Sequence, residues 1–424
     1  MTNSVNDVLR FVRDRDNDVK FARLAFCDLF GASKNISVPP EELPRAFAEG
    51  ISFDAEAVGG FAGGGNLFLY PEPGTLSVLP WRPQQGRVVR FYCAIKDERG
   101  VPSARDAREL LRRVLEKAEA EGFSVRIGAE CDFYLFKTDG EGGATAQPFD
   151  DGGYFDVFPL DRGENIRREL CFHLEEMSIT PESSHHARGP GQNGVAIKLS
   201  DALGGADNLL TLKTVVKTVA GRNGLHASFM PKPLAGGSGS GLTLRLALSR
   251  GNADVFRRPD FAKQGAHAGF VAGILEKTAE ITAFLNTLPN SYKRLEETEV
   301  AARPAWSFTD RDAVVRVPPE KGEASHIELN LPDPALNPYL ALALIIGAGL
   351  DGVQRNLPPP LLLATLPKSL GEAVQLARSS AFIRATLGEE LTDKYLAVKE
   401  QEAAAYAKAA DKDRFVFEKY FKTI

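Results

Sequence analysis

Two acidic residues stand one residue apart in an apolar stretch of the chain. Glu130 and Asp132 belong to "VRIGAECDFYLF", which has the composition of a buried strand. Because alternate side chains of a strand point to the same face, these two carboxylates should project together. Without a cation between them, one of the two should stay protonated. The pair indicates a cation site, although an acidic pair on a solvated face has the same pattern.

A second polar stretch, residues 184–194, reads "SHHARGPGQNG". Paired histidines ahead of a glycine turn suggest a metal-binding segment, yet the stretch contains no Asp, Glu or Cys. A divalent metal that handles phosphate prefers carboxylate oxygens as ligands. The segment is therefore either an unusual metal site or what remains of one.

Arginines and glycines supply two further candidates. Arg311 and Arg316 flank a strand-like run and Arg294 precedes it, a cluster suited to a carboxylate or phosphate. An arginine run is also common on solvated faces. The glycine-rich "GGSGSG" of residues 236–241 does not lie between a strand and a helix, so it does not predict a dinucleotide-binding unit.

The elements that must position these residues divide into two regions. Residues 1–104 predict a small α/β unit: a helix at "VNDVLRFVRD", two strands around a turn at Gly31, and a strand at "GRVVRFYCAI". Five glycines within residues 59–65 predict a long mobile loop, either a linker or a place of close approach. Further along, we expect a helix that opens at Ser103 with a capping box, and the polar run 290–318 is expected to be strand-like.

Strands and helices then alternate irregularly, with helices expected over 206–223 and 266–287 and strands at "HASFM" and "GLTLRLAL". Antiparallel strands with helices on one side predict the α+β class.

Composition narrows the classes of partner. The chain has 424 residues and a net charge of −5, which argues against nucleic acid or an anionic membrane as the main partner. Four scattered cysteines are expected to be reduced thiols. The apolar run "YLALALIIGAGL" is about twelve residues long and predicts a buried helix, since a membrane span needs about 20. The polar start lacks a signal-peptide core, and we expect a cytoplasmic protein.

Together these stretches resemble the glutamine synthetase family over nearly the whole chain. The resemblance is carried by "RLAFCDLFGASKNISVP", "FDAEAVGG", "LPWRP", "ADNLLTLKTVVKTVAGRNGLHASFMPKP", "GSG", "NSYKRL" and "LPDPALNPYLALALIIGAGLDG". It implies a β-grasp domain over residues 1–104 and a catalytic α+β domain over residues 105–424. It also implies homo-oligomeric rings, usually dodecamers, with active sites between neighbouring subunits.

In that family two divalent metals, Mg²⁺ or Mn²⁺, bridge ATP and glutamate. ATP phosphorylates the γ-carboxylate, and ammonia then displaces the phosphate. The metals neutralise the charge that spreads over the transferring phosphoryl oxygens.

Several site positions of the family are retained in this chain. The resemblance makes Glu130 and Glu328 ligands of the phosphate-side metal and Asp132 a ligand of the other metal. Asp54 matches the ammonium-site aspartate, and Glu299 matches the loop glutamate that closes the site. Gly239 matches a glycine that contacts glutamate through its backbone. Three arginines match those that grip substrate and phosphate: Arg294, Arg311 and Arg316.

Other positions depart from the family pattern. Two glutamate ligands are replaced by Ala187 and Gly194, and a ligating histidine is replaced by Thr243. Arg245 replaces a second histidine, and Ser238 replaces the asparagine before the substrate glycine. Asn330 replaces an arginine that contacts substrate and phosphate, and His326 replaces an arginine near the nucleotide base.

By this comparison one metal keeps a single ligand and the other keeps two. Two arginines, Arg188 and Arg245, appear in the same segments, and we hypothesise that they pair with Glu130, Asp132 and Glu328 to give a metal-independent pocket. A carboxylate cluster with no cation would be costly to bury. The alternative is that Arg188 points to solvent and one weakly bound metal persists.

Two functions follow. In the first, the chain no longer makes glutamine and instead binds an amino acid or nucleotide, or acts as a regulator or scaffold, for example in assembly with an active paralogue. In the second, it is an ATP-dependent carboxylate–amine ligase that joins a γ-carboxylate to another amine with one metal. Unrelated metal-free chemistry in the same pocket is a third alternative.

Overall fold

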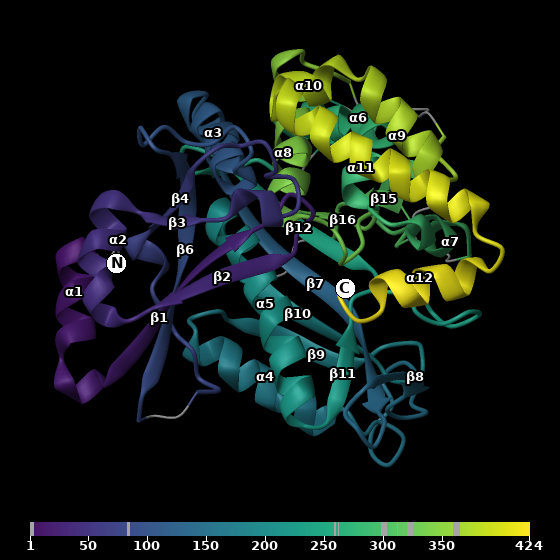
Figure 1. The fold of residues 1–424 in the computed structure, drawn as a ribbon. Coiled ribbons are helices and arrows are strands. Elements are labelled where there is room, and N and C mark those ends of the chain that lie inside the picture. The colour runs from purple at the N-terminus through teal and green to yellow at the C-terminus, as the bar shows by residue number, and fades with distance from the viewer. Residues whose placement is uncertain are drawn as a thin grey trace.

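The computed structural model describes residues 4–82, 85–257, 260–261, 263–297, 303–311, 313–319, 325–358 and 365–424. Two sheets organise the chain, and helices pack around the larger one (Figure 1). This is the α+β architecture that the sequence predicts. Glu299 lies outside the described residues.

The N-terminal sheet is a small mixed sheet. Its strands follow the order β2-β1-β6-β4-β3, and only the β1–β6 pair is parallel. The strands and their helices are β1 (Val19–Cys27), β2 (Ser33–Val38), β3 (Ile51–Phe53), β4 (Leu67–Pro71), β5 (Ser77–Val78), β6 (Arg87–Asp97), α1 (Val5–Arg13) and α2 (Leu43–Glu49). Alternating apolar residues such as Leu24, Leu69 and Phe91 form a core of their own on one face of this sheet.

The glycine-rich segment after β3 is anchored to the rest of the molecule. Arg105 donates a hydrogen bond to the Ala62 carbonyl oxygen at 2.9 Å and also bonds Phe61, and Lys394 donates to the Ala62 oxygen at 2.9 Å. Of the two alternatives, these contacts favour a place of close approach over a linker around Ala62, because side chains from distant elements hold its backbone.

The second sheet carries the candidate site. Its main path is β14-β15-β16-β12-β7-β10-β9, and all of its pairs are antiparallel except β14–β15. The strands are β7 (Phe123–Thr138), β8 (Ala144–Pro148), β9 (Pro181–His186), β10 (Gln192–Asp201), β11 (Leu225–Ser228), β12 (Leu242–Arg250), β13 (Ala253–Asp254), β14 (Arg303–Ser307), β15 (Ala313–Arg316) and β16 (Ile327–Leu329).

Helices cover this sheet and form the C-terminal part of the fold (Figure 1). They are α3 (Ala107–Ala120), α4 (Glu164–Glu176), α5 (Ala202–Arg222), α6 (Ala266–Leu285), α7 (Pro289–Glu297), α8 (Pro338–Gln354), α9 (Leu370–Ser379), α10 (Ala381–Leu387), α11 (Glu389–Lys408) and α12 (Lys412–Tyr420). Two expectations are corrected. The helix expected at Ser103 begins at Ala107, because the Asp106 side chain accepts the free N–H groups of Arg108 and Glu109. Residues 289–297 are helical rather than strand-like.

The run "YLALALIIGAGL" lies in α8, which is buried against α6 as the sequence predicts. The two helices approach so closely that a Cβ added at Gly273 would collide with the Ala348 carbonyl oxygen. Among the described residues, no helix is long and apolar enough to cross a membrane.

An ion-pair network joins the N-terminal region to three helices of the larger part of the fold. Arg108 of α3 makes two hydrogen bonds of 2.9 and 2.8 Å to Asp207 of α5 and an ion pair of 2.6 Å to Glu72 of the N-terminal region. The Tyr339 hydroxyl donates to the same Asp207 at 2.6 Å. These bonds fix the N-terminal sheet against the helices behind the candidate site.

Candidate functional site

Cross-strand register brings the acidic and substituted positions together on the large sheet. Gly194 of β10 lies opposite Asp132 of β7 and, on its other side, opposite His185 of β9. Glu130 lies opposite Thr243 of β12. Because opposite residues on neighbouring antiparallel strands have their Cβ atoms about 4.5–5.5 Å apart, residues scattered over more than a hundred positions become neighbours.

Four of these residues, Glu130, Asp132, His185 and Thr243, line a cavity of about 470 Å³. Its wall comes from β7, the β9–β10 segment, the glycine-rich loop before β12, and α7. Among the expected residues it contains Glu130, Asp132, Ala187, Arg188, Ser238, Gly239, Thr243, Arg294 and Asn330. The cavity has the size of a small-molecule site.

Arg245 of β12 binds Glu130 from outside the cavity lining. Its guanidinium forms an ion pair with Glu130 at 3.1 Å (Nη2 to Oε2) and a second with Glu182 of β9. The Arg245 side chain is 14% exposed, whereas its partners Glu130 and Glu182 are 35% and 45% exposed, so the guanidinium is more buried than the carboxylates that it binds. The positive charge of Arg245 thus already neutralises the Glu130 carboxylate.

Glu328 is also paired with an arginine. Arg316 lies opposite Glu328 in the β15–β16 register and donates to it at 2.8 Å, and His326 lies 3.8 Å from the same carboxylate. Burial raises the pKa of Glu328, but the hydrogen bond from His326 and the charge of Arg316 outweigh burial and hold it below its ordinary value. Arg316, expected to grip substrate, is engaged with a protein carboxylate.

Asp132 faces the cavity in a different environment. Burial and the charge of Glu130 raise its pKa to about 7, although a hydrogen bond from the Gly241 N–H opposes this shift. A Cβ at Gly194 would lie 3.2 Å from the Asp132 carboxylate and 2.8 Å from the His185 ring. Glycine at position 194 therefore leaves space between Asp132 and His185 and supplies no ligand atom.

The glycine-rich loop packs tightly against the cavity. A Cβ at Gly239 would collide with the Arg294 side chain, and the Gly239 carbonyl oxygen accepts a hydrogen bond of 2.9 Å from Gln192. Tyr134 donates to the Ser238 carbonyl oxygen at 2.7 Å. Arg294 is fully buried and donates to the Leu331 carbonyl oxygen at 2.5 Å. Only glycine fits at position 239, which brings the loop backbone to the cavity wall.

Arg188 is the second arginine of the hypothesis. It is exposed, it lines the cavity, and its guanidinium lies 6.0 Å from the centre of the Tyr154 ring. The charge of Arg188 acts to lower the pKa of Asp132, but burial and the charge of Glu130 act in the opposite direction and prevail.

Some expected residues lie away from this cavity. Asp54 is exposed, caps a short helical turn in the N-terminal region, and does not line the cavity. Arg311 is exposed and does not line it either. Within one chain, therefore, the structure brings neither residue to the cavity.

Sequence reasoning missed several cavity residues. Lys232 is buried and donates to the Gly237 carbonyl oxygen at 2.7 Å, and Tyr154 also lines the wall, beside His185 and Gln192 of the expected segment 184–194. Glu182 holds Arg245 from outside the cavity lining. The histidine pair and "GQN" were noticed as a motif, whereas an isolated lysine before a proline carried no signal of its own.

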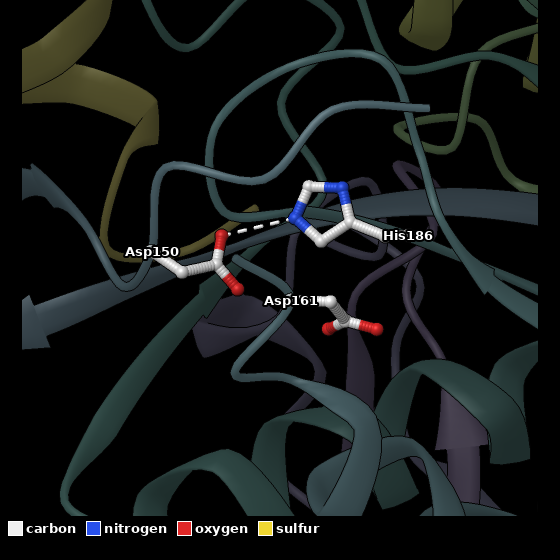
Figure 2. A group of neighbouring side chains, drawn as sticks. All are labelled: Asp150, Asp161 and His186. Carbon is white, nitrogen blue, oxygen red and sulfur yellow. Dashed lines mark hydrogen bonds and ion pairs between the residues drawn. The ribbon is translucent and has the colours of Figure 1, made fainter. Parts of the chain in front are cut away.

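Behind the cavity lies a buried charged network (Figure 2). Asp150, Asp161 and His186 are the one set of three possible metal ligands, among the residues described, whose ligand atoms all lie within 4.8 Å of one another. His186 Nε2 lies 2.9 Å from Asp150 Oδ1, and its Nδ1 lies 2.8 Å from the Ala187 carbonyl oxygen. Arg167 binds Asp161 through two bonds of 3.1 and 2.5 Å.

The charged groups of the network also bind the backbone and Asn193. Asp150 also accepts the backbone N–H groups of Arg162 and Gly191 at 2.9 and 2.8 Å. Arg167 further donates to Asn193 Oδ1 at 2.6 Å. Since each of these charged groups already has protein partners, the network serves to hold the segment 186–193 in place rather than to bind a metal.

The cavity residues do not fit two divalent metals. Glu130, and Glu328 outside the cavity lining, are engaged by guanidinium groups, and the Thr243 hydroxyl donates to Asn330 Oδ1 at 3.1 Å. Ala187 and Gly194 offer no side-chain oxygen. A hard cation needs several free oxygen ligands, and here the carboxylates of Glu130 and Glu328 accept hydrogen bonds from arginines instead.

A small N-terminal sheet followed by a large, mostly antiparallel sheet that carries the cavity is the architecture of a known ligase family. The chain matches the glutamine synthetase β-grasp domain over residues 18–98 and the glutamine synthetase catalytic domain over residues 104–418. The chain belongs to the glutamine synthetase family.

Similar proteins span nearly the whole chain. The glutamine synthetase of Clostridium saccharobutylicum is 38% identical over 418 residues, covering 93% of this chain and 94% of the relative. That of Methanosarcina mazei is 37% identical, covering 94% of each. A solved GmaS–ADP complex superimposes with a TM-score of 0.86 at 26% identity, covering 99% of both chains. Plasmodium falciparum glutamine synthetase shares the fold at a TM-score of 0.86 and 23% identity, covering 99% of both chains.

Proposed function

We propose that this member of the glutamine synthetase family binds a small molecule in the 470 Å³ cavity without a divalent metal and does not carry out ordinary glutamate–ammonia ligation. The observation that carries the proposal is the Arg245–Glu130 ion pair of 3.1 Å. A guanidinium fixed there supplies the positive charge that a metal would otherwise bring, but it cannot bridge two substrates as a metal does.

The cavity favours an anionic or zwitterionic ligand. Arg188, Lys232 and Arg294 line it, and the charge of Glu130 is already balanced by Arg245. An amino acid or a nucleotide provides carboxylate or phosphate oxygens for these cations and an amino or base group for Asp132. We expect binding to serve regulation or scaffolding, including the control of an active paralogue.

The same proposal includes assembly of the chain with further copies of itself. Asp54 is exposed and stands apart from the cavity of its own chain. In a homo-oligomeric ring, a neighbouring subunit could bring Asp54 to the cavity edge. Size measurement by light scattering tests the ring, for which a dodecamer is the expected form, and a monomer would contradict it.

The second candidate is an ATP-dependent carboxylate–amine ligase of altered specificity. It is favoured by relatives named glutamine synthetase that are 38% identical over 93% of this chain, and by the retained Glu130 and Asp132 in the cavity. Such a ligase would need one Mg²⁺ or Mn²⁺ near Glu130 and Glu328, with Arg245 and Arg316 displaced from these carboxylates.

The first experiment is a thermal-shift titration with ATP, ADP and L-glutamate, each with and without Mg²⁺ or Mn²⁺. A ligand that binds the folded state raises the melting temperature with its concentration. Stabilisation that is independent of metal supports the metal-free cavity. Stabilisation by nucleotide only when metal is present contradicts it and favours the ligase.

Arg245→Gln sharpens this test. Removing the guanidinium leaves Glu130 and Glu182 without their partner, so the variant should gain a stabilising response to Mn²⁺ that the unaltered chain lacks. Arg250→Gln, at the far end of the same strand, is the matched control. The unaltered chain should also be given ATP, glutamate and a panel of amines. Release of ADP or phosphate that requires the amine would establish the ligase instead.

A further inference from the structure

A second cavity lies between the N-terminal sheet and the helices of the large domain. It has a volume of about 60 Å³, and β1, β2, β6 and α5 contribute to its wall. Its floor is largely apolar, with Trp81 and Met177 buried against the core. None of its described lining residues is an aspartate or a glutamate, whereas three of them are cationic: Arg23, Lys34 and Arg90.

Two of these cations stand directly opposite each other. Arg23 of β1 pairs with Arg90 of β6 in the parallel register, so their side chains leave the same face of the sheet side by side. Like charges on directly opposite residues destabilise a sheet. Burial and the charge of nearby Arg82 lower the pKa of Arg23, as expected for a guanidinium in a positive environment.

Neither arginine has a carboxylate partner in the described chain. Arg90 donates to Thr211 Oγ1 at 2.8 Å and stacks on the Tyr92 ring at 4.0 Å, but its buried Nε has no hydrogen-bond partner. The Arg23 side chain makes no hydrogen bond or ion pair with a described residue. Lys34 is 3.7 Å from Asp28, so it is partly neutralised.

We propose that this cleft binds a small oxyanion, whose carboxylate or phosphate group lies between Arg23 and Arg90 and whose apolar part lies on Trp81. A volume of 60 Å³ holds a group of a few heavy atoms. The bound anion neutralises the opposed guanidiniums and links β1 and β6 to α5. This proposal does not depend on the function of the larger cavity.

The test is isothermal titration calorimetry on the full chain at constant ionic strength, with sodium phosphate in one series and sodium butyrate in the other. We expect saturable binding of at least one of them, which identifies whether phosphate or carboxylate is preferred. Arg23→Gln should weaken that binding about tenfold or more, the loss of one charge-assisted hydrogen bond. Arg23→Lys should retain an intermediate affinity, because it keeps the charge.

Two matched variants locate the site. Arg45→Gln removes an exposed arginine of the same domain that pairs with Glu42, and binding should be unchanged. Arg188→Gln alters the larger cavity and should leave binding unchanged as well. In the absence of the anion at low salt, Arg23→Gln should melt at the same temperature as the unaltered chain or higher, because repulsion is relieved.

Three results would overturn the proposal. The first is no saturable binding of either anion, and the second is binding that Arg23→Gln leaves intact. The third is binding that is lost in Arg188→Gln but kept in Arg23→Gln, which would place the anion in the larger cavity.

Discussion

The segment formed by β9 and β10 has two sides that differ in the polar side chains that they carry and in the hydrogen bonds of those side chains. On the cavity side, Ala187 and Gly194 contribute no polar side chain, and His185 faces the space beside Gly194. On the buried side, His186 and Asn193 are hydrogen-bonded within the network of Asp150, Asp161 and Arg167.

The difference separates what the fold requires from what metal-dependent chemistry requires. Buried polar groups without partners cost about 1–3 kcal/mol each, so the network behind the segment is needed whether or not a metal binds. Exposed metal ligands stabilise the fold little in the absence of the ion, so they can be replaced without unfolding the chain. A family member can therefore lose its ligands and keep the segment that held them.

The largest effect should follow from breaking the buried side at Arg167. Arg167→Met leaves Asp161, whose side chain is 3% exposed, without its guanidinium partner. Loss of one member of a buried ion pair costs about 3–5 kcal/mol. Urea unfolding should show this loss, while Arg168→Met, which removes an exposed arginine one position further, should change stability little. Equal effects of the two variants would contradict the distinction between the two sides.

His186 should make stability depend on pH. Burial lowers the pKa of His186, but the hydrogen bond to Asp150 outweighs burial and raises it above its ordinary value. Protonated His186 therefore stabilises the fold at pH values below about 6.5, and this contribution is lost as pH rises through the raised pKa. The pKa of Asp150 is lowered: burial raises it, but hydrogen bonds from His186 and two backbone N–H groups prevail. Its contribution is lost only as pH falls through that lowered value.

His186→Gln should reduce stability at pH 6 by about 1–3 kcal/mol, the cost of unsatisfied buried partners. The difference from the unaltered chain should narrow toward pH 8. Urea unfolding at both pH values measures it, with His267→Gln as the control. A difference that does not vary with pH would show that the ion pair with Asp150 is unimportant.

On the cavity side, Gly194→Glu should be tolerated at moderate cost. Its Cβ would lie 2.8 Å from the His185 ring, so the ring must shift, and overpacking of this kind costs about 1–3 kcal/mol. A carboxylate beside Asp132 should also give the variant a stabilising response to Mn²⁺. Gly140→Glu, in open space, is the control for added charge. No response to Mn²⁺ would contradict the proposal that the absence of a carboxylate at position 194 contributes to a metal-free cavity.

The smallest effect on stability is expected at Arg188. It is exposed on the cavity side, so Arg188→Gln should change the free energy of unfolding by less than about 0.5 kcal/mol. The same variant should weaken binding of an anionic ligand to the cavity, measured by thermal shift with ATP or L-glutamate. A stability loss as large as that of Arg167→Met would contradict the assignment of Arg188 to the ligand side.

Much of the fold could be predicted from the sequence. Motif order identified the family, and apolar patterning predicted the α+β class and the buried helix α8. The helix start at Ala107 was missed because Ser103 and Asp106 both offer caps, and backbone geometry chose Asp106. Residues 289–297 were misassigned because their polar residues obscured a helix whose partners lie elsewhere in the chain.

By itself, the sequence determined which ligand atoms are absent, because the lack of an oxygen at Ala187 and Gly194 is a property of the residue alone. Only the tertiary structure decided which charges meet. Arg245 meets Glu130 and Glu182, and Arg316 meets Glu328, through the register of strands that are far apart in the chain. The energy of an ion pair depends on distance and burial, and both of these are fixed by the packing of the whole sheet.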